Sequence, residues 1–162
     1  MMILPFAAVF AALVHIAFDR SKKGPGRISE ILLSYIFPVV IGLGGLTAFY
    51  GHAFMSDRIA ESIGWPAGNP FQIEVAVTNL AFGILGLMCI RFRKGFWLAT
   101  GIGVSIFYLG AAFVHLREML LKGNMSINNS GYILWANDIV LPLFILLLLT
   151  VYYAFPVIES KK

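Results

Sequence analysis

Six ionisable residues lie within stretches of the sequence that are otherwise almost entirely apolar. They are His15, His52, Glu74, His115, Glu118 and Asp138. An ionisable group is costly to keep in apolar surroundings, so residues of this kind are candidates for a functional role. Histidine and carboxylate side chains can relay protons and can bind transition metals such as Zn or Fe. The chemistry available to this chain therefore depends on whether its fold brings these residues together.

The composition indicates what surrounds them. Of the 162 residues, 59% are hydrophobic and only 12% are charged, about half the charged share of a soluble domain. The single Cys89 excludes a disulfide framework within the chain and a site built from several cysteines. A soluble domain, a disordered chain and a nucleic-acid-binding protein are all excluded. The sequence predicts a multi-pass protein of the cell membrane, with the lipid bilayer as its surroundings.

Five segments are long enough, or nearly so, to cross a bilayer, which takes about 20 apolar residues. They cover residues 2–18, 31–54, 71–90, 96–116 and 132–155. Together they leave no room for a separate soluble domain. We therefore expect residues 1–162 to form one all-α domain, a bundle of five transmembrane helices. Pro38 and Pro142 fall inside two of these helices and predict kinks there.

The basic residues predict the orientation of this bundle. Nine of the twelve fall on one side of the predicted helices. These nine are Arg20, Lys22, Lys23, Arg27, Arg91, Arg93, Lys94, Lys161 and Lys162. Arg58, Arg117 and Lys122 fall on the other side. Because Lys and Arg are concentrated in cytoplasmic loops, we expect the N-terminus outside and the C-terminus in the cytoplasm.

In this orientation five of the six ionisable residues lie at one depth near the outer face, and His15 lies near the inner face. Helical spacing places small and polar residues on the same stripes. One stripe contains Gly101, Ser105, Tyr108, Ala112, His115 and Glu118, and another contains Gln72, Asn79, Gly83 and Gly86. Small residues let membrane helices approach closely, so these stripes should face inward. The predicted polar pocket consists of His52, Glu74, Asn79, Tyr108, His115, Glu118, Asn137 and Asp138.

The residue types leave three roles open for this pocket. It could hold Zn or Fe through His52, Glu74, His115, Glu118 and Asp138. Helical di-iron proteins use paired Glu-x-x-His motifs, however, and this chain has only one such spacing, in reverse order. The pocket could instead bind a quinone, with Tyr50, Tyr108 and Trp65 beside the ring. Or the polar groups could be structural, with carboxylates favoured near helix N-termini and Arg residues as their partners.

The predicted outer loops carry two further signals. Residues 57–63 can form a short helix, with Ser56 as its N-cap, Gly64 at its end and Trp65 at the level of the lipid headgroups. The segments 124–126 and 128–130 match the N-glycosylation pattern Asn-x-Ser. Chance explains these matches better, because Asn and Ser are concentrated in this loop.

Three stretches of the sequence resemble DoxX-type membrane proteins, and more closely an uncharacterised bacterial and archaeal branch of DoxX-like character. They are Gly51-His52-Ala53-Phe54, Pro70-Phe71-Gln72-Ile73-Glu74 and the glycine-containing stretch 79–86. The resemblance covers the last four predicted helices. It implies a four-helix core with one added N-terminal helix, and a link to quinone-dependent sulfur oxidation or redox-stress complexes. His115, Glu118 and Asp138 do not map onto the DoxX pattern.

These observations predict a membrane protein that binds a ligand or a partner at its polar pocket. As an accessory, redox-associated subunit it would assemble with other membrane subunits or with a second copy of itself. An enzyme that uses a metal or a quinone is the alternative. A small transporter is a third, and it is disfavoured because the inner half of the predicted bundle has almost no polar residues to continue a path.

Overall fold

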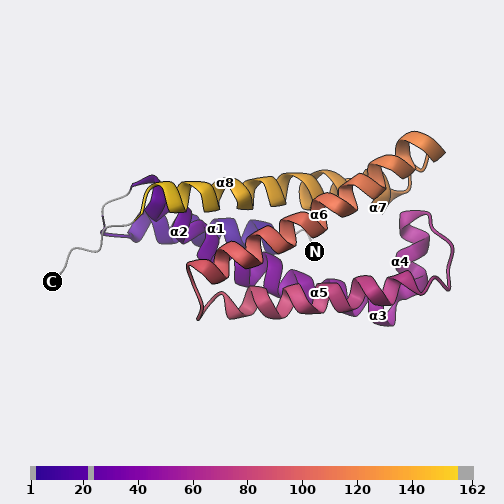
Figure 1. Cartoon of the computed structure of the whole chain (residues 1–162), viewed down its shortest axis with the longest axis horizontal. Helices are drawn as coiled ribbons and strands as arrows, with labels where there is room; N and C mark the ends of the chain where they lie inside the picture. Colours follow the sequence, from indigo (N-terminus) through magenta and orange to yellow (C-terminus); the bar gives the residue numbers. More distant parts are fainter. Residues whose placement is uncertain (1–2, 22–23, 157–162) are drawn as a thin grey trace.

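The computed structural model of the protein describes residues 3–21 and 24–156. Of the described residues 84% are helical, and none of them lies in a strand. The helices before residue 65 are α1 (Ile3–Phe18), α2 (Pro25–Tyr35), η1 (Ile36–Leu43), α3 (Gly44–Phe54) and α4 (Ser56–Ile63). Those after it are α5 (Phe71–Met88), α6 (Gly95–Lys122), α7 (Ile127–Ser130), η2 (Ile133–Val140) and α8 (Leu141–Ala154). Figure 1 shows their arrangement in an elongated bundle.

Four helices are long and apolar enough to cross a membrane. They cover Pro25–Phe54, Phe71–Met88, Gly95–Lys122 and Ile127–Ala154. Each corresponds to a predicted segment. The first begins six residues before the predicted start and the last begins five before it, and the third ends six residues after the predicted end. The remaining helix, α1, is apolar but has only 16 residues, which gives it a length of about 24 Å.

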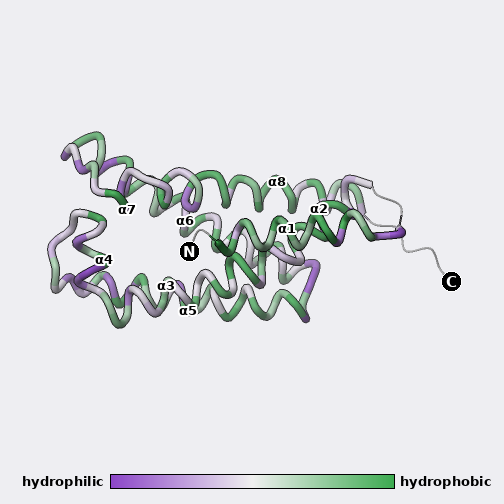
Figure 2. Tube along the Cα trace, turned by 180° about the vertical axis from the view of Figure 1, so that it is seen from behind, coloured by the Kyte–Doolittle hydropathy of each residue, from purple (hydrophilic) through white to green (hydrophobic). Residues whose placement is uncertain are grey.

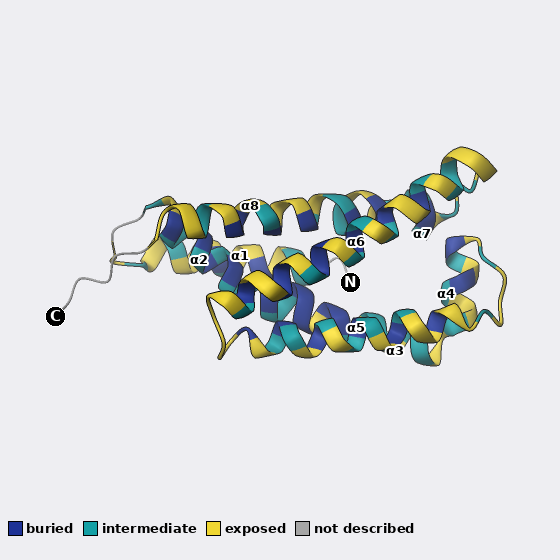
Figure 3. Ribbon diagram, viewed as in Figure 1, coloured by how far each residue is buried: buried dark blue, intermediate teal, exposed yellow. Residues whose placement is uncertain are grey.

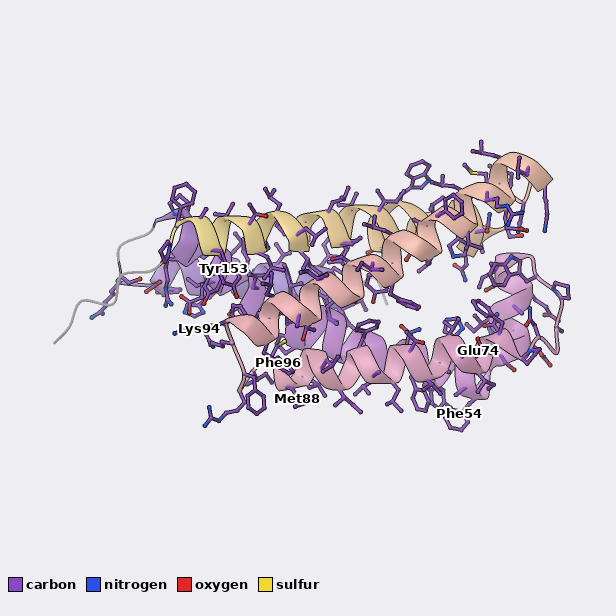
Figure 4. All side chains as sticks on the ribbon, viewed as in Figure 1. Phe54, Glu74, Met88, Lys94, Phe96 and Tyr153 are labelled. Carbon is purple, nitrogen blue, oxygen red and sulfur yellow. The ribbon has the colours of Figure 1, made fainter. Side chains whose placement is uncertain are left out.

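The long helices pack in two layers that diverge along the bundle. In one layer α3 and η1 pack against α5, and in the other α6 packs against α8 and η2. The layers meet where α2 packs against α8, separate toward the other end (Figure 1), and are bridged there by contacts between α4 and α7. We call the first region the closed end and the second the open end. Lys94 and Tyr153 lie at the closed end, and Phe54 and Glu74 lie at the open end (Figure 4).

A continuous apolar core fills the closed end. Leu33, Phe37, Trp97 and Ile145 have no exposed surface. The rings of Phe37 and Trp97 are 5.7 Å apart, and the Trp97 indole N–H donates to the carbonyl of Cys89 at 2.9 Å. Buried residues lie mainly where helices face one another, and exposed residues cover the outer faces (Figure 3). The hydrophilic residues are concentrated at the two ends of the bundle (Figure 2).

Glycines allow the helices of the lower layer in Figure 1 to approach closely. A Cβ atom added to Gly86 would lie 2.7 Å from the carbonyl oxygen of Phe37, and one added to Gly45 would lie 2.8 Å from the Cα of Gly83. Both contacts are shorter than real Cβ contacts, so no larger residue fits without moving backbone. The prediction that small residues mark close helix packing is confirmed for these positions.

The two prolines inside the long helices lie in or next to π-helical turns. Pro38 lies within η1, and Pro142 lies two residues after η2. Proline lacks an N–H donor, and its ring crowds the carbonyl four residues earlier, which for Pro142 belongs to Asp138. A π-helical turn is one way for a helix to accommodate such a defect, and it is frequent at functional sites. Both long helices continue through these turns.

The closed end carries a network of ion pairs. The guanidinium of Arg27 pairs with Asp19 and with Glu30, each at 2.8 Å, and Arg93 reaches the other oxygen of Glu30 at 2.9 Å. The bond from Arg27 holds the pKa of Asp19 well below its ordinary value. Arg93 also lies 5.1 Å from the ring centre of Trp97. Of the other basic residues predicted on this side, Lys22, Lys23, Lys161 and Lys162 lie outside the described residues.

Candidate functional site

A cavity of about 620 Å³ lies between the two layers at the open end. Its walls come from α3, α5, α6 and η2, and α4 with Trp65 covers its end. Most of the lining is apolar and aromatic, with a few polar side chains among it. This volume is in the range of about 300–1,000 Å³ that small-molecule sites occupy.

Six of the eight residues predicted to form a polar pocket line this cavity. They are His52, Asn79, Tyr108, His115, Asn137 and Asp138. Five of the predicted stripe residues on α6, Gly101, Ser105, Tyr108, Ala112 and His115, are buried. The inward direction of that face is therefore confirmed.

The structure does not bring the other two predicted residues, Glu74 and Glu118, to the cavity. Glu74 is exposed, because it lies two residues after Gln72, and two residues turn a helix by about 200°. When Gln72 faces the cavity, Glu74 faces away from it. Glu118 forms an ion pair with Lys122 at 2.8 Å, one helical turn further along α6.

His52 is held by Gln72 on one wall of the cavity. Nδ1 of His52 lies 2.7 Å from Oε1 of Gln72, and Gln72 is almost fully buried. Since the amide oxygen can only accept, Nδ1 of His52 must carry the hydrogen of this bond. Gln72 was part of a predicted polar stripe but not of the predicted pocket. Its position in the first turn of that helix, at the same depth as the other pocket residues, could have identified it as a pocket residue.

His115 is held by Asn129 on the opposite wall. Nδ2 of Asn129 donates to the carbonyls of His115 and Asn124, at 3.2 and 2.8 Å. This leaves Oδ1 of Asn129 facing Nδ1 of His115 at 2.9 Å. The oxygen can only accept, so Nδ1 of His115 carries the hydrogen. Asn129 has no exposed surface, and as part of an Asn-x-Ser match it was not recognised from the sequence as a site residue.

Trp65 covers the same histidine. Its ring is stacked on the ring of His115, with centres 6.1 Å apart and planes 24° apart. The ring of Phe71 also packs against Trp65, with ring centres 6.0 Å apart. The sequence predicted Trp65 at the headgroup level and, for a quinone pocket, beside the bound ring. The structure includes Trp65 in the cavity lining. The short helix α4 before this loop ends at Gly64 with φ of 82°, as predicted. The predicted N-cap is wrong, because Ser56 is the first helical residue and no side chain caps the helix.

Asp138 lies in η2 and is 3% exposed. Its Oδ1 accepts a hydrogen bond from Asn137 at 2.8 Å. Its Oδ2 accepts none from any residue that the structure describes, and it lies 3.8 Å from Nε2 of His115. That distance is too long for a hydrogen bond.

The predicted metal ligands do not converge. Within residues 3–21 and 24–156, no three His, Cys, Asp or Glu side chains form a group that could hold a metal ion. Glu74 is exposed, Glu118 pairs with Lys122 outside the lining, and both histidines use Nδ1 for amide partners. His15, predicted to be apart from the others, is exposed near the closed end and pairs with the Tyr35 hydroxyl at 3.3 Å.

The chemistry of the cavity follows from its lining. Apolar and aromatic walls favour an apolar body, and the amides, histidines and carboxylate offer hydrogen bonds from both walls. The lining contains no Lys or Arg among the described residues. Such a site suits a molecule with an apolar body and one polar group.

Comparison with known proteins gives one family match. A family of unknown function, DUF6790, matches residues 1–156. No curated protein and no solved structure matches the chain. The DoxX resemblance, which this match does not address, stays a prediction.

Proposed function

The chain belongs to the family of unknown function DUF6790, and we propose that it is a membrane protein that binds a small amphipathic molecule in the cavity at the open end. The observation that carries this proposal is the cavity itself, about 620 Å³ of mainly apolar space bordered by buried polar side chains. A well-packed membrane bundle has no structural need for a hollow of this size. Buried polar groups beside it would fix the orientation of a bound molecule.

The outer border of the cavity supports access from the lipid. Tyr50 on α3 and Ile106 on α6 line the cavity and are 59% and 68% exposed. Val114, two turns beyond Ile106, also lines it and is exposed. Exposed apolar residues on membrane-spanning helices contact lipid tails. An amphipathic molecule dissolved in the bilayer could therefore reach the cavity from the side.

We also propose the five-helix topology, with the N-terminus outside and the cavity near the outer face. The described basic residues of the closed end, including Arg20, Arg91 and Lys94, support a cytoplasmic position for that end. The exposed apolar residues of α1, such as Phe6 and Phe10, support its place in the bilayer. Four further lysines on the same predicted side support this orientation, although they lie outside the described residues: Lys22, Lys23, Lys161 and Lys162.

Cysteine labelling in intact cells tests this topology. In a Cys89→Ala background, a membrane-impermeant maleimide should label Ala67→Cys, in the exposed loop after α4, and should not label Gly95→Cys. Cys89 is buried, so its replacement removes background without changing the surface. Labelling of Gly95→Cys alone would reverse the proposed orientation.

A variant that fills the cavity tests the proposed binding. A Cβ added at Gly110 meets no atom within 4 Å, so Gly110→Trp should place its indole in the cavity without disturbing the backbone. Ala99→Trp is the matched control, because Ala99 is exposed on the same helix and does not line the cavity. Organic extracts of the purified proteins should contain one small molecule per chain in the wild type and the control, and much less in Gly110→Trp. Equal recovery from all three, or none from any, would contradict the proposal.

The same extracts also test the alternative function, an enzyme that uses a quinone. The buried Tyr108, His115 and Asp138 beside an aromatic-lined space favour a quinone-dependent reaction as the second candidate. A quinone in the wild-type extract would favour that reaction or a subunit of a redox complex. Transport is disfavoured, because a fully packed core of Leu33, Phe37 and Trp97 fills the closed end beyond the cavity.

A further inference from the structure

The polar group that the cavity would recognise can be inferred from Asp138. Asp138 lines the cavity, and its Oδ2 is buried and accepts no hydrogen bond from the described residues. A buried polar atom without a partner is costly, and a buried carboxylate without a counter-charge is more costly still. Asn137 supplies one hydrogen bond to the other oxygen but no charge. Asp138 therefore requires a donor, and preferably a cation.

The neighbouring histidine adds a second acceptor. Because Nδ1 of His115 donates to Asn129, the neutral ring has its lone pair on Nε2. This Nε2 lies 3.8 Å from Oδ2 of Asp138. Two acceptors thus face each other at a distance that one donor atom with two hydrogens can bridge, at about 2.8 Å from each. A protonated amine has such hydrogens, and a single hydroxyl has only one.

The surroundings also favour a cation. No Lys or Arg lines the cavity among the described residues, so nothing in the lining competes for the carboxylate except the histidines. The ring of Trp65 is stacked on His115, and the ring of Tyr108 lines the cavity beside Asp138. Aromatic faces attract cations, most strongly in places shielded from water.

We propose that the cavity binds a lipophilic ammonium, a primary or secondary amine on an apolar body, with its nitrogen between Asp138 and His115. This inference rests on the proposed binding function and names its ligand class. The apolar body lies against the aliphatic and aromatic walls, and the ammonium donates to Oδ2 of Asp138 and Nε2 of His115. A charge-assisted hydrogen bond of this kind is about twice as strong as a neutral one.

Two probes of the same shape test this assignment. 4-Phenylbutylamine and 4-phenylbutan-1-ol differ only in the ammonium and the hydroxyl. Their binding to the full chain is measured by calorimetry in phosphatidylcholine nanodiscs, with empty nanodiscs as the correction for partitioning. The wild type should bind the amine about tenfold or more tightly than the alcohol, because only the amine pairs with the carboxylate.

Matched variants separate the carboxylate from the cavity. Asp138→Asn should lose the preference for the amine and keep the binding of the alcohol, which also shows that the variant is folded. Glu74→Gln removes a carboxylate at the same end of the bundle but outside the cavity, and it should change neither affinity. Gly110→Trp should weaken both probes, and Ala99→Trp should weaken neither.

The outcomes also separate the two proposals. Equal affinity of the wild type for amine and alcohol, both lost in Gly110→Trp, would overturn the ammonium assignment and leave the proposed binding function intact. An unchanged amine preference in Asp138→Asn would overturn the role of this carboxylate. Failure of the wild type to bind either probe would overturn the ammonium class, while a different molecule in the wild-type extract would still support the cavity as a binding site.

Discussion

The two ends of the bundle use buried and half-buried polar side chains in opposite ways. At the closed end, Arg27 and Arg93 neutralise Asp19 and Glu30 through short ion pairs, and the space beneath them is filled by Trp97 and Phe37. At the open end Asp138 lines a cavity with no Lys or Arg among its described lining residues, and the nearest basic group is the His115 ring at 3.8 Å. A region that only has to be stable satisfies its polar groups internally, whereas a region that binds a ligand leaves some of them for that ligand. This contrast supports the proposal that the open end is the functional one.

The largest expected effect comes from the core of the closed end. Trp97→Ala should lower the free energy of unfolding by about 3–5 kcal/mol, because it leaves a large cavity and frees the carbonyl of Cys89. Unfolding in a detergent titration, followed by circular dichroism, measures this loss. Trp135→Ala is the control, since Trp135 at the open end is 52% exposed and its loss should cost little. Similar losses in both variants would break the proposed contrast.

The next effect concerns the glycine contact between α5 and η1. Gly86→Ala should lower the free energy of unfolding by about 1–3 kcal/mol, because its Cβ would meet the backbone of Phe37 and the helices would have to separate. Gly110→Ala adds the same methyl group toward open space and should be stabilising by about 0.5–1 kcal/mol through helix propensity alone. The same detergent titration compares the two variants. Destabilisation by Gly110→Ala equal to that by Gly86→Ala would show that the open end is packed rather than hollow.

A third prediction has the opposite sign. Asp138→Asn should raise the free energy of unfolding of the ligand-free protein by about 1 kcal/mol, because it removes a buried charge that lacks a counter-charge. The same titration, run on protein stripped of lipophilic molecules, measures the gain. Glu30→Gln is the matched control at the closed end, and it should be destabilising because it leaves Arg27 and Arg93 with one partner fewer. A loss of stability in Asp138→Asn would mean that this carboxylate has a structural partner.

The smallest expected effect is a dependence on pH at the closed end. The pKa of Asp19 lies below its ordinary value because Arg27 and Ser21 donate to its carboxylate. The unfolded chain therefore binds this proton more readily, so the stability that Asp19 contributes is present above about pH 4 and is lost as the pH falls further. Asp19→Asn should remove this part of the acid dependence, as measured by thermal unfolding between about pH 2 and 5. An acid profile identical to that of the wild type would show that the ion pair does not act on stability.

Much of the fold could be predicted because the responsible signals are local. A run of about 20 apolar residues can bury its polar backbone in a membrane only as a helix, so the long helices follow from the sequence. The stripe through Tyr108, Ala112 and His115 has helical spacing, and its burial was therefore predictable. The glycine contacts of Gly45, Gly83 and Gly86 were predictable for the same reason.

The site could be predicted only in part, because it depends on the rotation of each helix and on the loops. Glu74 and Gln72 are two residues apart, and the spacing of polar residues alone did not decide which of them faces the cavity. Asn129 and Trp65 come from loops whose path follows from tertiary packing. The π-helical turn before Pro142 adds a local change of helical phase, which a count at 3.6 residues per turn does not include.

By itself the sequence determined the class of this protein, its apolar helices, the close glycine contacts and six of the polar residues that line the cavity. These follow from composition and from periodicity along a single helix. Only the tertiary structure decided that the two layers diverge and that a cavity lies between them. It also decided that Asp138 and His115 face each other across 3.8 Å, while Glu74 and Glu118 lie outside the cavity lining. The physical reason is that distances between helices are set by side chains meeting across the bundle, and no pattern along one helix contains them.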